Sequence, residues 1–598
     1  MSWNICFILS VAIFILAIVI SIVKLSIRGK KVLLKPFYIF AVSVAISTML
    51  IFYPVYFGYF EGTINLFFRV VKSILFSIYS TIGLFLADSN FELIETMVSS
   101  ANLSVLLTQS YTIFASILFV VVPISTFGII LSFFKNVISY VRYWCSFAKP
   151  IYIFSYLNDY SVTLAEDIFR NHKNSSIVFT DVYNKEEKER QELIDRIEAI
   201  GAICFKKDIS SIKFGFHLKG KKSKMYFFVL NEKEEENIKI FSHLSDTYRN
   251  RSNAIIYLFS KTSQGELVIS SSENRKLQVR KINYAQSLVY RTFFERGEEI
   301  FANAKLDENG QKIISAVVIG LGNYGSILTK TLAWYCQMDG YKIKINAFDK
   351  ENQAKSNFIS SCSELMSEKY NGKLITGEPH YDIQIHAGIQ YDSKEFDDEL
   401  KKIKDATVVF VCCGSDGTNI DCAVKVRKIF EGEKMQPTIN TIVYDSKQKS
   451  RIESAKNFKN QPYNINCIGD IKTTYSEKVI INSELEKEAL ARHLKYGSEE
   501  DFWKYDYNYR SSLATALHMR ARIFCGIPGA NKQQDEATEQ EKEIISLLEH
   551  KRWNAYMRTE GYSFGERRND LAKQHHNLVP FSELTAGDII KDTKVGLK

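Results

Sequence analysis

The chain has 598 residues, which is enough for three or four domains. Hydrophobic residues make up 46% of it and charged residues 24%, while 29 glycines and 9 prolines are too few for a collagen-like or linker-dominated protein. Ten cysteines without any C-x-x-C pair argue against a disulfide scaffold, a zinc finger or a thioredoxin-type site. Long uncharged runs fall before residue 145 and most charges follow, so a membrane region is predicted to precede polar domains.

The membrane region is predicted at residues 1–145, with spans at 3–23, 37–60 and 111–134. A stretch of about 20 apolar residues crosses a hydrocarbon core of about 30 Å. The first run is long, has no preceding basic residue and no A-x-A site after it, which argues against a secretory signal peptide. The stretch 66–88 has a short apolar part, which is typical of a re-entrant or interfacial helix.

Basic residues flank these runs and predict the topology. They follow the first and the last run, at Lys24, Arg28, Lys30, Lys31 and Lys35 and at Lys135, Arg142 and Lys149. Because basic loops stay in the cytoplasm, an even number of crossings separates the two groups. We therefore expect three spans, with the C-terminal domains in the cytoplasm; four spans remain an alternative. These charges match anionic lipid, so no nucleic-acid partner is expected.

The stretch 66–88 also permits a pore interpretation. Thr81-Ile82-Gly83 matches the beginning of a T-V-G-Y-G potassium filter, but Leu84-Phe85 replaces its end. An amphipathic membrane helix is therefore favoured over a potassium filter, and a pore without potassium selectivity stays open.

Two tandem α/β domains are predicted after the membrane region, at 150–300 and 311–480. In each, short apolar strands alternate with helical stretches, which predicts a doubly wound, Rossmann-like parallel sheet with helices on both faces. The second domain carries Gly320, Gly322 and Gly325 as a G-x-G-x-x-G turn between a strand and a helix, and its next strand ends at Asp349. This pattern predicts a pocket for NAD or another adenine nucleotide. The alternative is that the glycines only permit close helix–strand packing.

The first α/β domain aligns with the second but lacks the glycines. Ser155, Leu157 and Tyr160 stand at their places, so this copy is predicted to be a degenerate one. Residues 150–480, behind membrane spans, resemble the tandem TrkA-N or RCK regulatory domains of potassium channels and uptake systems. A dehydrogenase would need a proton donor, and no Tyr-x-x-x-Lys pair stands in a convincing context.

The C-terminal residues 495–598 are rich in Trp, Tyr, Arg and His. They contain E-H-x-R-W from Glu549, G-Y-x-F-G from Gly561, and H-x-L-V-P-F from His576. These motifs resemble the ryanodine-receptor repeat, or RyR domain; one departure is Asn577, where the family usually has proline. The resemblance implies a small, mainly α-helical domain that senses nucleotide-like molecules.

The candidate ligand-binding residues of the RyR-like domain combine aromatic rings, which can stack on bases, with arginines, which can bind phosphates. They are Arg552, Trp553, Glu549, Arg558, Tyr562, Phe564, Arg567 and His576. The alternative is that the aromatic residues form the domain core and that Arg552 and Glu549 form an ordinary helix ion pair.

Together these features predict a homo-oligomeric, ligand-gated membrane effector or ion channel that senses a nucleotide-type second messenger. The family resemblance implies a bacterial inner membrane as the location and antiviral defence as the context. No catalytic residue or metal site is predicted. Two alternatives are a membrane-anchored NAD-dependent oxidoreductase and a non-conducting regulatory subunit of a potassium transport system.

Overall fold

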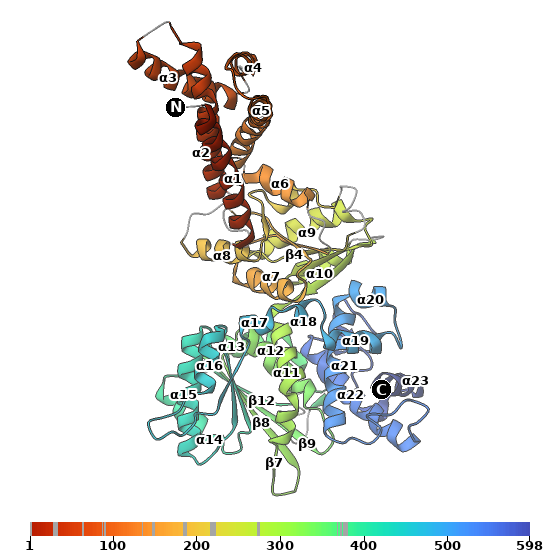
Figure 1. Ribbon diagram of the computed structural model, residues 1–598. Coiled ribbons are helices and arrows are strands. Elements are labelled where there is room, and N and C mark those ends of the chain that lie inside the picture. Colours follow the sequence, from red (N-terminus) through yellow and green to blue (C-terminus); the bar gives the residue numbers. More distant parts are fainter. Residues whose placement is uncertain are drawn as a thin grey trace. The chain divides into compact units, whose positions relative to one another are not determined.

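The computed structural model of the chain is shown in Figure 1. It describes residues 3–27, 34–62, 65–86, 88, 91–133, 135–145, 150–182, 188–215, 223–271, 276–367, 369–370, 373–374 and 381–597. The chain divides into two compact units, one with residues 1–158 and 172–225 and the other with residues 159–171 and 226–598.

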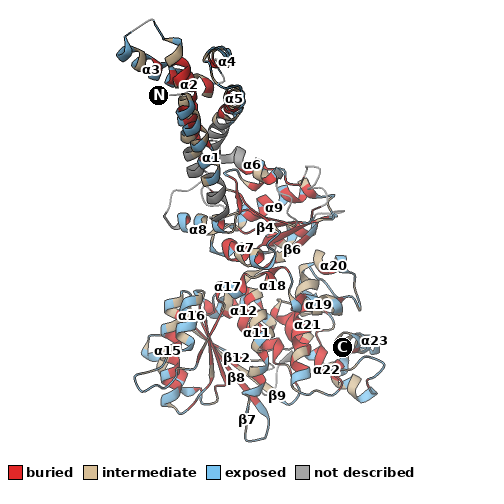
Figure 2. Ribbon diagram, in the orientation of Figure 1, coloured by how far each residue is buried: buried red, intermediate tan, exposed pale blue. Residues whose placement is uncertain are grey.

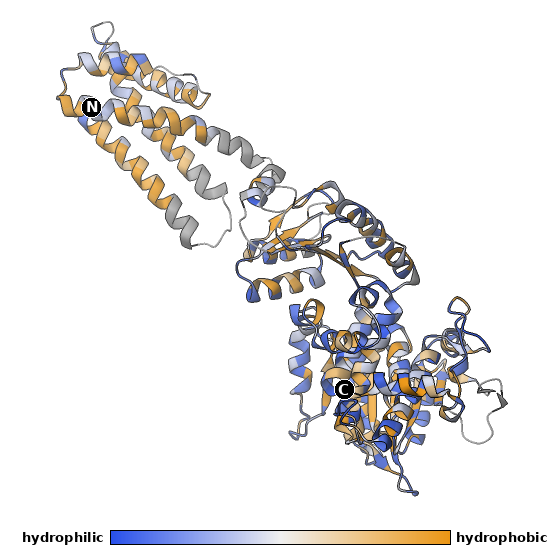
Figure 3. Cartoon of the chain, turned by 90° about the vertical axis from the view of Figure 1, so that its right-hand side faces the viewer, coloured by the Kyte–Doolittle hydropathy of each residue, from blue (hydrophilic) through white to orange (hydrophobic). Residues whose placement is uncertain are grey.

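The first unit begins with apolar helices, whose ribbons are largely orange, the colour of hydrophobic residues, in Figure 3. They are α1 (Trp3–Ile27), α2 (Leu34–Tyr59), α3 (Leu66–Phe85), α4 (Phe91–Ser100) and α5 (Val105–Phe133). Among the described residues, α1, α2, α3 and α5 are long and apolar enough to cross a membrane. This confirms a helical N-terminal region that suits a membrane. Helix α3 is one of these four candidate spans, although the sequence analysis predicts that it does not cross the membrane. The three-span topology therefore stays a prediction.

Helix α3 bears on the pore interpretation. Its 20 residues include the Thr81-Ile82-Gly83 segment, which is regular α-helix. Helical carbonyls bond within the helix, so they are not lined up to replace the hydration shell of an ion. The structure therefore contradicts a potassium filter at this segment, in agreement with the helix interpretation that the sequence favoured.

The first sheet has six strands in the order β3-β2-β1-β4-β5-β6. They are β1 (Ile151–Phe154), β2 (Ser176–Phe179), β3 (Ile203–Cys204), β4 (Met225–Val229), β5 (Ala254–Phe259) and β6 (Gln278–Ile282). The helices between them are α7 (Asp159–Asn171), α8 (Lys188–Ala199), α9 (Glu234–Tyr248) and α10 (Ser263–Ser270). The β1–β2, β2–β3 and β5–β6 pairs are parallel, which confirms the predicted α/β layout.

The second sheet repeats this strand order as β12-β9-β8-β13-β14-β15. Its strands are β8 (Lys312–Ile319), β9 (Tyr341–Asp349), β12 (Asp382–Ala387), β13 (Val408–Val411), β14 (Thr438–Ile442) and β15 (Ile465–Ile468), with β7 (Lys305–Leu306) antiparallel to β8. The connecting helices are α11 (Tyr284–Ala302), α12 (Asn323–Tyr335), α13 (Ala354–Ser361), α14 (Lys394–Lys402), α15 (Asp416–Gly432) and α16 (Ser446–Glu453). The order 3-2-1-4-5-6 is that of doubly wound sheets, and its reversal lies between β8 and β13.

The C-terminal residues are mainly helical, as expected. They form α17 (Ile471–Thr474), α18 (Glu477–Ile480), α19 (Glu484–His493), α20 (Glu499–Lys504), α21 (Asp506–Phe524), α22 (Glu539–Thr559) and α23 (Ala586–Gly596), with a pair of short strands, β16 (Ser563–Phe564) and β17 (Gln574–His575).

One hydrophobic core joins the C-terminal helices to the second α/β domain, and buried residues appear red in Figure 2. Trp334 of α12 packs edge-on against Tyr556 of α22, with ring centroids 6.1 Å apart. His518 of α21 bonds to the carbonyl of Gln337, which follows α12, at 2.9 Å. The C-terminal helices therefore pack directly on the helix that begins at the glycine turn.

Candidate nucleotide-binding site

The glycine turn connects β8 to α12, and its three glycines have different surroundings. Gly320 has φ of +93°, and a Cβ there would lie 2.6 Å from the carbonyl oxygen of Cys412. A Cβ on Gly325 would lie 1.7 Å from the carbonyl oxygen of Gly320. A Cβ on Gly322 would meet nothing within 4 Å. Gly320 and Gly325 thus permit close packing of the protein chain. Gly322 faces open space, where a ligand phosphate can approach the protein backbone.

Asp349, at the end of β9, holds the turn in place. Its Oδ2 accepts a hydrogen bond from the Leu321 backbone N–H at 2.6 Å, and its Oδ1 accepts one from Glu351 N–H at 2.8 Å. A carboxylate that accepts backbone N–H bonds keeps further lone pairs for other donors. Asp349 is therefore positioned to support the turn and, at the same time, to accept from ribose hydroxyls.

A cleft with a volume of about 580 Å³ opens above this turn. It is lined at the carboxyl edge of the sheet by Ile319, Gly320, Gly322, Asn323, Tyr324, Phe348, Asp349, Lys350, Glu351, Ile389, Gln390, Tyr391, Cys412, Cys413, Gly414, Thr418, Asn419, Ile442 and Tyr444. Small-molecule sites are usually roughly 300–1,000 Å³, and in open α/β sheets they lie where the strand order reverses. Three of the four predicted cofactor residues line the cleft; Gly325 is not among them and serves the packing of α12.

A second helix begins at the same cleft, and none of its residues is among the predicted cofactor-binding residues. After β13, Gly414 has φ of +131°, and Ser415 caps α15 by accepting from Thr418 N–H at 3.3 Å. The N-terminus of a 17-residue helix therefore adds N–H donors and a positive dipole end beside those of α12. The signal in the sequence was the pair Gly414 and Gly417 around a Ser-Asp cap.

Two tyrosines stand at the wall of the cleft. The hydroxyls of Tyr324 and Tyr444 hydrogen-bond to each other, and their ring centroids lie 6.3 Å apart. Burial raises the pKa of Tyr444 to about 12, and it raises the pKa of Tyr324 further. A general acid works best with a pKa near the working pH, so neither phenol is tuned for proton transfer near neutrality.

Further tyrosines surround this pair. Tyr284, at the start of α11, packs edge-on against Tyr324 with centroids 6.1 Å apart, and Tyr160 packs against Tyr475 at 4.6 Å. In the first α/β domain, Tyr160 occupies the position that Gly325 has in the second. The first α/β domain thus places an aromatic ring where the second has a glycine.

In the C-terminal region, residues 495–598, three predicted ligand residues lie in the interior. Glu549 accepts hydrogen bonds from Arg522 and Arg552, each at 2.5 Å, and all three side chains are almost completely buried. Burial alone would raise the pKa of Glu549, but the charges of the two arginines lower it below the ordinary value. Arg558, also buried, bonds to Asn554 at 2.6 Å and pairs with Glu364 of the second α/β domain at 3.4 Å.

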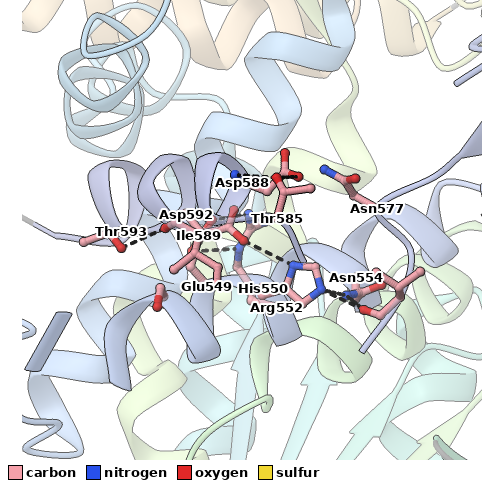
Figure 4. Close-up of polar contacts among 12 residues, drawn as sticks. Glu549, His550, Arg552, Asn554, Asn577, Thr585, Asp588, Ile589, Asp592 and Thr593 are labelled. Atoms are coloured by element: carbon pink, nitrogen blue, oxygen red, sulfur yellow. Dashed lines mark hydrogen bonds and ion pairs between the residues drawn. The ribbon is translucent and has the colours of Figure 1, made fainter. Parts of the chain in front are cut away.

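His550 lies beside this network and connects three segments (Figure 4). Its Nδ1 lies 3.2 Å from Oδ2 of Asp592 on α23, and its Nε2 lies 2.8 Å from the carbonyl oxygen of Val579. Burial raises the pKa of Asp592. These contacts hold α22, α23 and the loop before α23 together, which is a structural role. Glu549, Arg552 and Arg558 form ion pairs with other residues inside the protein. Ligand contact by these three residues stays a prediction.

The remaining predicted ligand residues lie nearer the surface. Trp553, Tyr562 and Phe564 are half-buried, and Arg567 and His576 are exposed. The structure brings Trp553 against the His575 ring at 4.9 Å, and His575 stacks on His576 at 4.9 Å. The Trp553–His575–His576 stack offers one accessible aromatic surface through Trp553 and His576, since His575 is buried; the half-buried Tyr562 and Phe564 offer others.

Comparisons with known proteins add no assignment. No protein-family model matches the chain, and a search of curated proteins finds no match. Among the described residues, no group of three or more His, Cys, Asp or Glu side chains could hold a metal ion.

Proposed function

We propose that this protein is a membrane-anchored effector or ion channel that is gated by a nucleotide-type ligand bound in the cleft of the second α/β domain. The observation that carries the proposal is this cleft, in a chain whose N-terminal helices are suited to a membrane. The large C-terminal part lies in the cytoplasm of a bacterium, and the antiviral context comes from the resemblance to RyR and TrkA-N proteins.

The cleft chemistry favours a phosphorylated adenosine-type ligand. Gly322 leaves space for a phosphate, two helix N-termini supply N–H donors, and Asp349 supplies a carboxylate for ribose hydroxyls. The aliphatic side chain of Ile389 and the aromatic ring of Tyr391 line the same cleft and provide apolar surface on which a base can pack. NAD, AMP or a cyclic nucleotide each contain these groups.

The RyR-like region supports a sensing role through its packing. It shares a core with α12, and Arg558 pairs with Glu364, which follows α13. A ligand that moves the start of α12 therefore changes a surface on which α21 and α22 rest. Conversely, a second ligand on the Trp553–His575–His576 stack would act on the same helices.

An oligomer is part of this proposal. Three spans from a single chain leave little room for a conduit, so several copies must surround one. The oxidoreductase alternative would need a proton donor at the cleft, and the raised pKa values of Tyr324 and Tyr444 argue against these two residues in that role.

The test uses the full chain in liposomes with a fluorescent ion-flux readout. NAD, AMP, ATP, cyclic AMP and cyclic dinucleotides are added to the side that exposes the C-terminal domains, and binding is measured in parallel by calorimetry. We expect at least one to bind and to increase flux. Binding without flux would favour a non-conducting regulatory subunit, and ligand turnover would favour an enzyme.

The matched variants are Gly322→Val and Gly432→Val. Both positions have open space for a side chain, but Gly322 lines the cleft and Gly432 ends α15 away from it. We expect Gly322→Val to weaken nucleotide binding by at least about tenfold, or 1.4 kcal/mol, and Gly432→Val to leave it unchanged. Equal affinities in both variants would place the ligand elsewhere.

A further inference from the structure

Helix α6 (Lys135–Cys145) begins immediately after the apolar helix α5, and the same compact unit holds both. Residues 139–144 of α6 make specific contacts with the first α/β domain. Ser139 Oγ donates to the carbonyl of Cys204 at 2.5 Å, and Arg142 Nη2 donates to the carbonyl of Gly201 at 3.0 Å. One side of the helix is thus bonded to the backbone at β3.

Aromatic packing reinforces this attachment. Tyr140 packs edge-on against Phe205 and Tyr143 against Phe214, with centroids 5.0 and 5.5 Å apart. The Tyr143 hydroxyl also accepts a hydrogen bond from Gly215 N–H at 2.8 Å. Since these contacts involve successive turns of α6, the helix and the edge of the sheet are expected to move together.

The other face of α6 carries exposed apolar side chains. Val141 is 49% exposed and Trp144 is 67% exposed, and a spacing of three residues places them on one helix face. Tryptophan favours the membrane–water boundary, where its ring contacts acyl chains and its N–H stays hydrated.

We propose that α6 lies in the membrane–water interface, with Val141 and Trp144 in the boundary between lipid headgroups and acyl chains. The bilayer is the occupant of this face because α6 continues directly from α5, a candidate membrane span. In this arrangement α6 transmits movement of β3 to α5. The inference rests on the proposed function in one respect, namely that the N-terminal helices are embedded in a bilayer.

The test is tryptophan quenching in the full chain, reconstituted in vesicles of phosphatidylcholine and phosphatidylglycerol with brominated acyl chains. Wild type is compared with Trp144→Phe, with Trp3→Phe as a reference for α1, and with Trp503→Phe as a control in α20. We expect bromine atoms near the headgroup end of the acyl chains to quench the tryptophan fluorescence of the wild type. This quenching should be weaker in Trp144→Phe and unchanged in Trp503→Phe.

Two results would overturn the inference. If Trp3→Phe lowers the quenching and Trp144→Phe does not, the chain is embedded but α6 does not touch lipid. If wild type shows no quenching, the chain is not embedded and the proposed function fails as well.

A functional measurement complements the quenching. Val141→Ser combined with Trp144→Ser removes the apolar face, while Leu267→Ser on α10 removes an equally exposed side chain elsewhere. We expect the double variant to lose at least about tenfold of the ligand-evoked flux and to retain nucleotide affinity. Unchanged flux in the double variant would contradict a role of this face in transmission.

Discussion

The two α/β domains have the same strand order but differ in the turn after their first strand. In the second domain, three glycines form a turn with open space at Gly322. In the first domain, Ser155 and Leu157 fill the corresponding positions and are buried, and Tyr160 lies in the first turn of α7. The comparison teaches that apolar strands and alternating helices are sufficient for this topology, whereas room for a phosphate depends on the absence of a few side chains.

The largest expected effect is at Gly325 in the second domain. Gly325→Ala would place a Cβ 1.7 Å from the carbonyl oxygen of Gly320, and a backbone atom cannot move aside as a flexible side chain can. We expect a loss of about 3 kcal/mol or more in unfolding free energy, because α12 must shift and the shared core with it. Thermal unfolding of the full chain, with hydrogen exchange of β8 and α12, measures this effect.

Gly322→Ala is the matched control for that variant. Its Cβ meets no atom, so the unfolding temperature is expected to stay within the range of ordinary surface substitutions. If Gly325→Ala were as stable as Gly322→Ala, the inference that Gly325 is needed for packing and Gly322 is not would be wrong.

A smaller effect is expected at Tyr160 in the first domain. Tyr160→Ala removes the ring that packs against Tyr475 and costs about 1 kcal/mol, whereas Tyr160→Phe keeps the ring and most of the stability. Because Tyr160 does not line the cleft, nucleotide affinity is expected to change by less than about twofold in both variants. A large loss of affinity in Tyr160→Ala would show that the degenerate copy takes part in binding.

The smallest effect concerns the helix caps that follow the last strand of each sheet. Asn283, directly after β6, caps α11, and Asp470, two residues after β15, caps α17. Burial alone would raise the pKa of Asp470, but hydrogen bonds from Thr473, Lys449 and Ser446 lower it below the ordinary value. Its stabilising contribution is therefore present above the unfolded pKa of about 3.9 and is lost as the pH falls through the lower folded pKa.

Asp470→Asn should remove this pH dependence and, because it removes the ion pair with Lys449, cost roughly 0.5–1 kcal/mol at neutral pH. The difference in unfolding temperature between wild type and variant is expected to shrink as the pH falls below about 4. Asn283→Asp is the reciprocal control and should introduce such a slope in the first domain. A constant difference at all pH values would mean that Asp470 does not titrate as inferred.

Much of the fold and part of the site followed from the sequence. Alternating apolar strands and helices predicted both sheets, and Gly320, Gly322 and Asp349 were named because a strand, a glycine turn and an acidic strand end are all local features. The cleft residues Thr418, Asn419 and Tyr444 were not named, because parallel pairing brings β13 and β14 beside β8 from far along the chain. No local pattern specifies that juxtaposition.

The C-terminal region, residues 495–598, shows the same division. Its helices and the Glu549–Arg552 ion pair were foreseeable, because residues three apart on a helix are neighbours. The partners Arg522 and Glu364 come from other helical segments, and only packing around the shared core reveals that Glu549 and Arg558 are buried. Short-range periodicity therefore determines the elements and the glycine turn, while burial and long-range pairing determine which charges are available to a ligand, since these depend on how the hydrophobic faces meet.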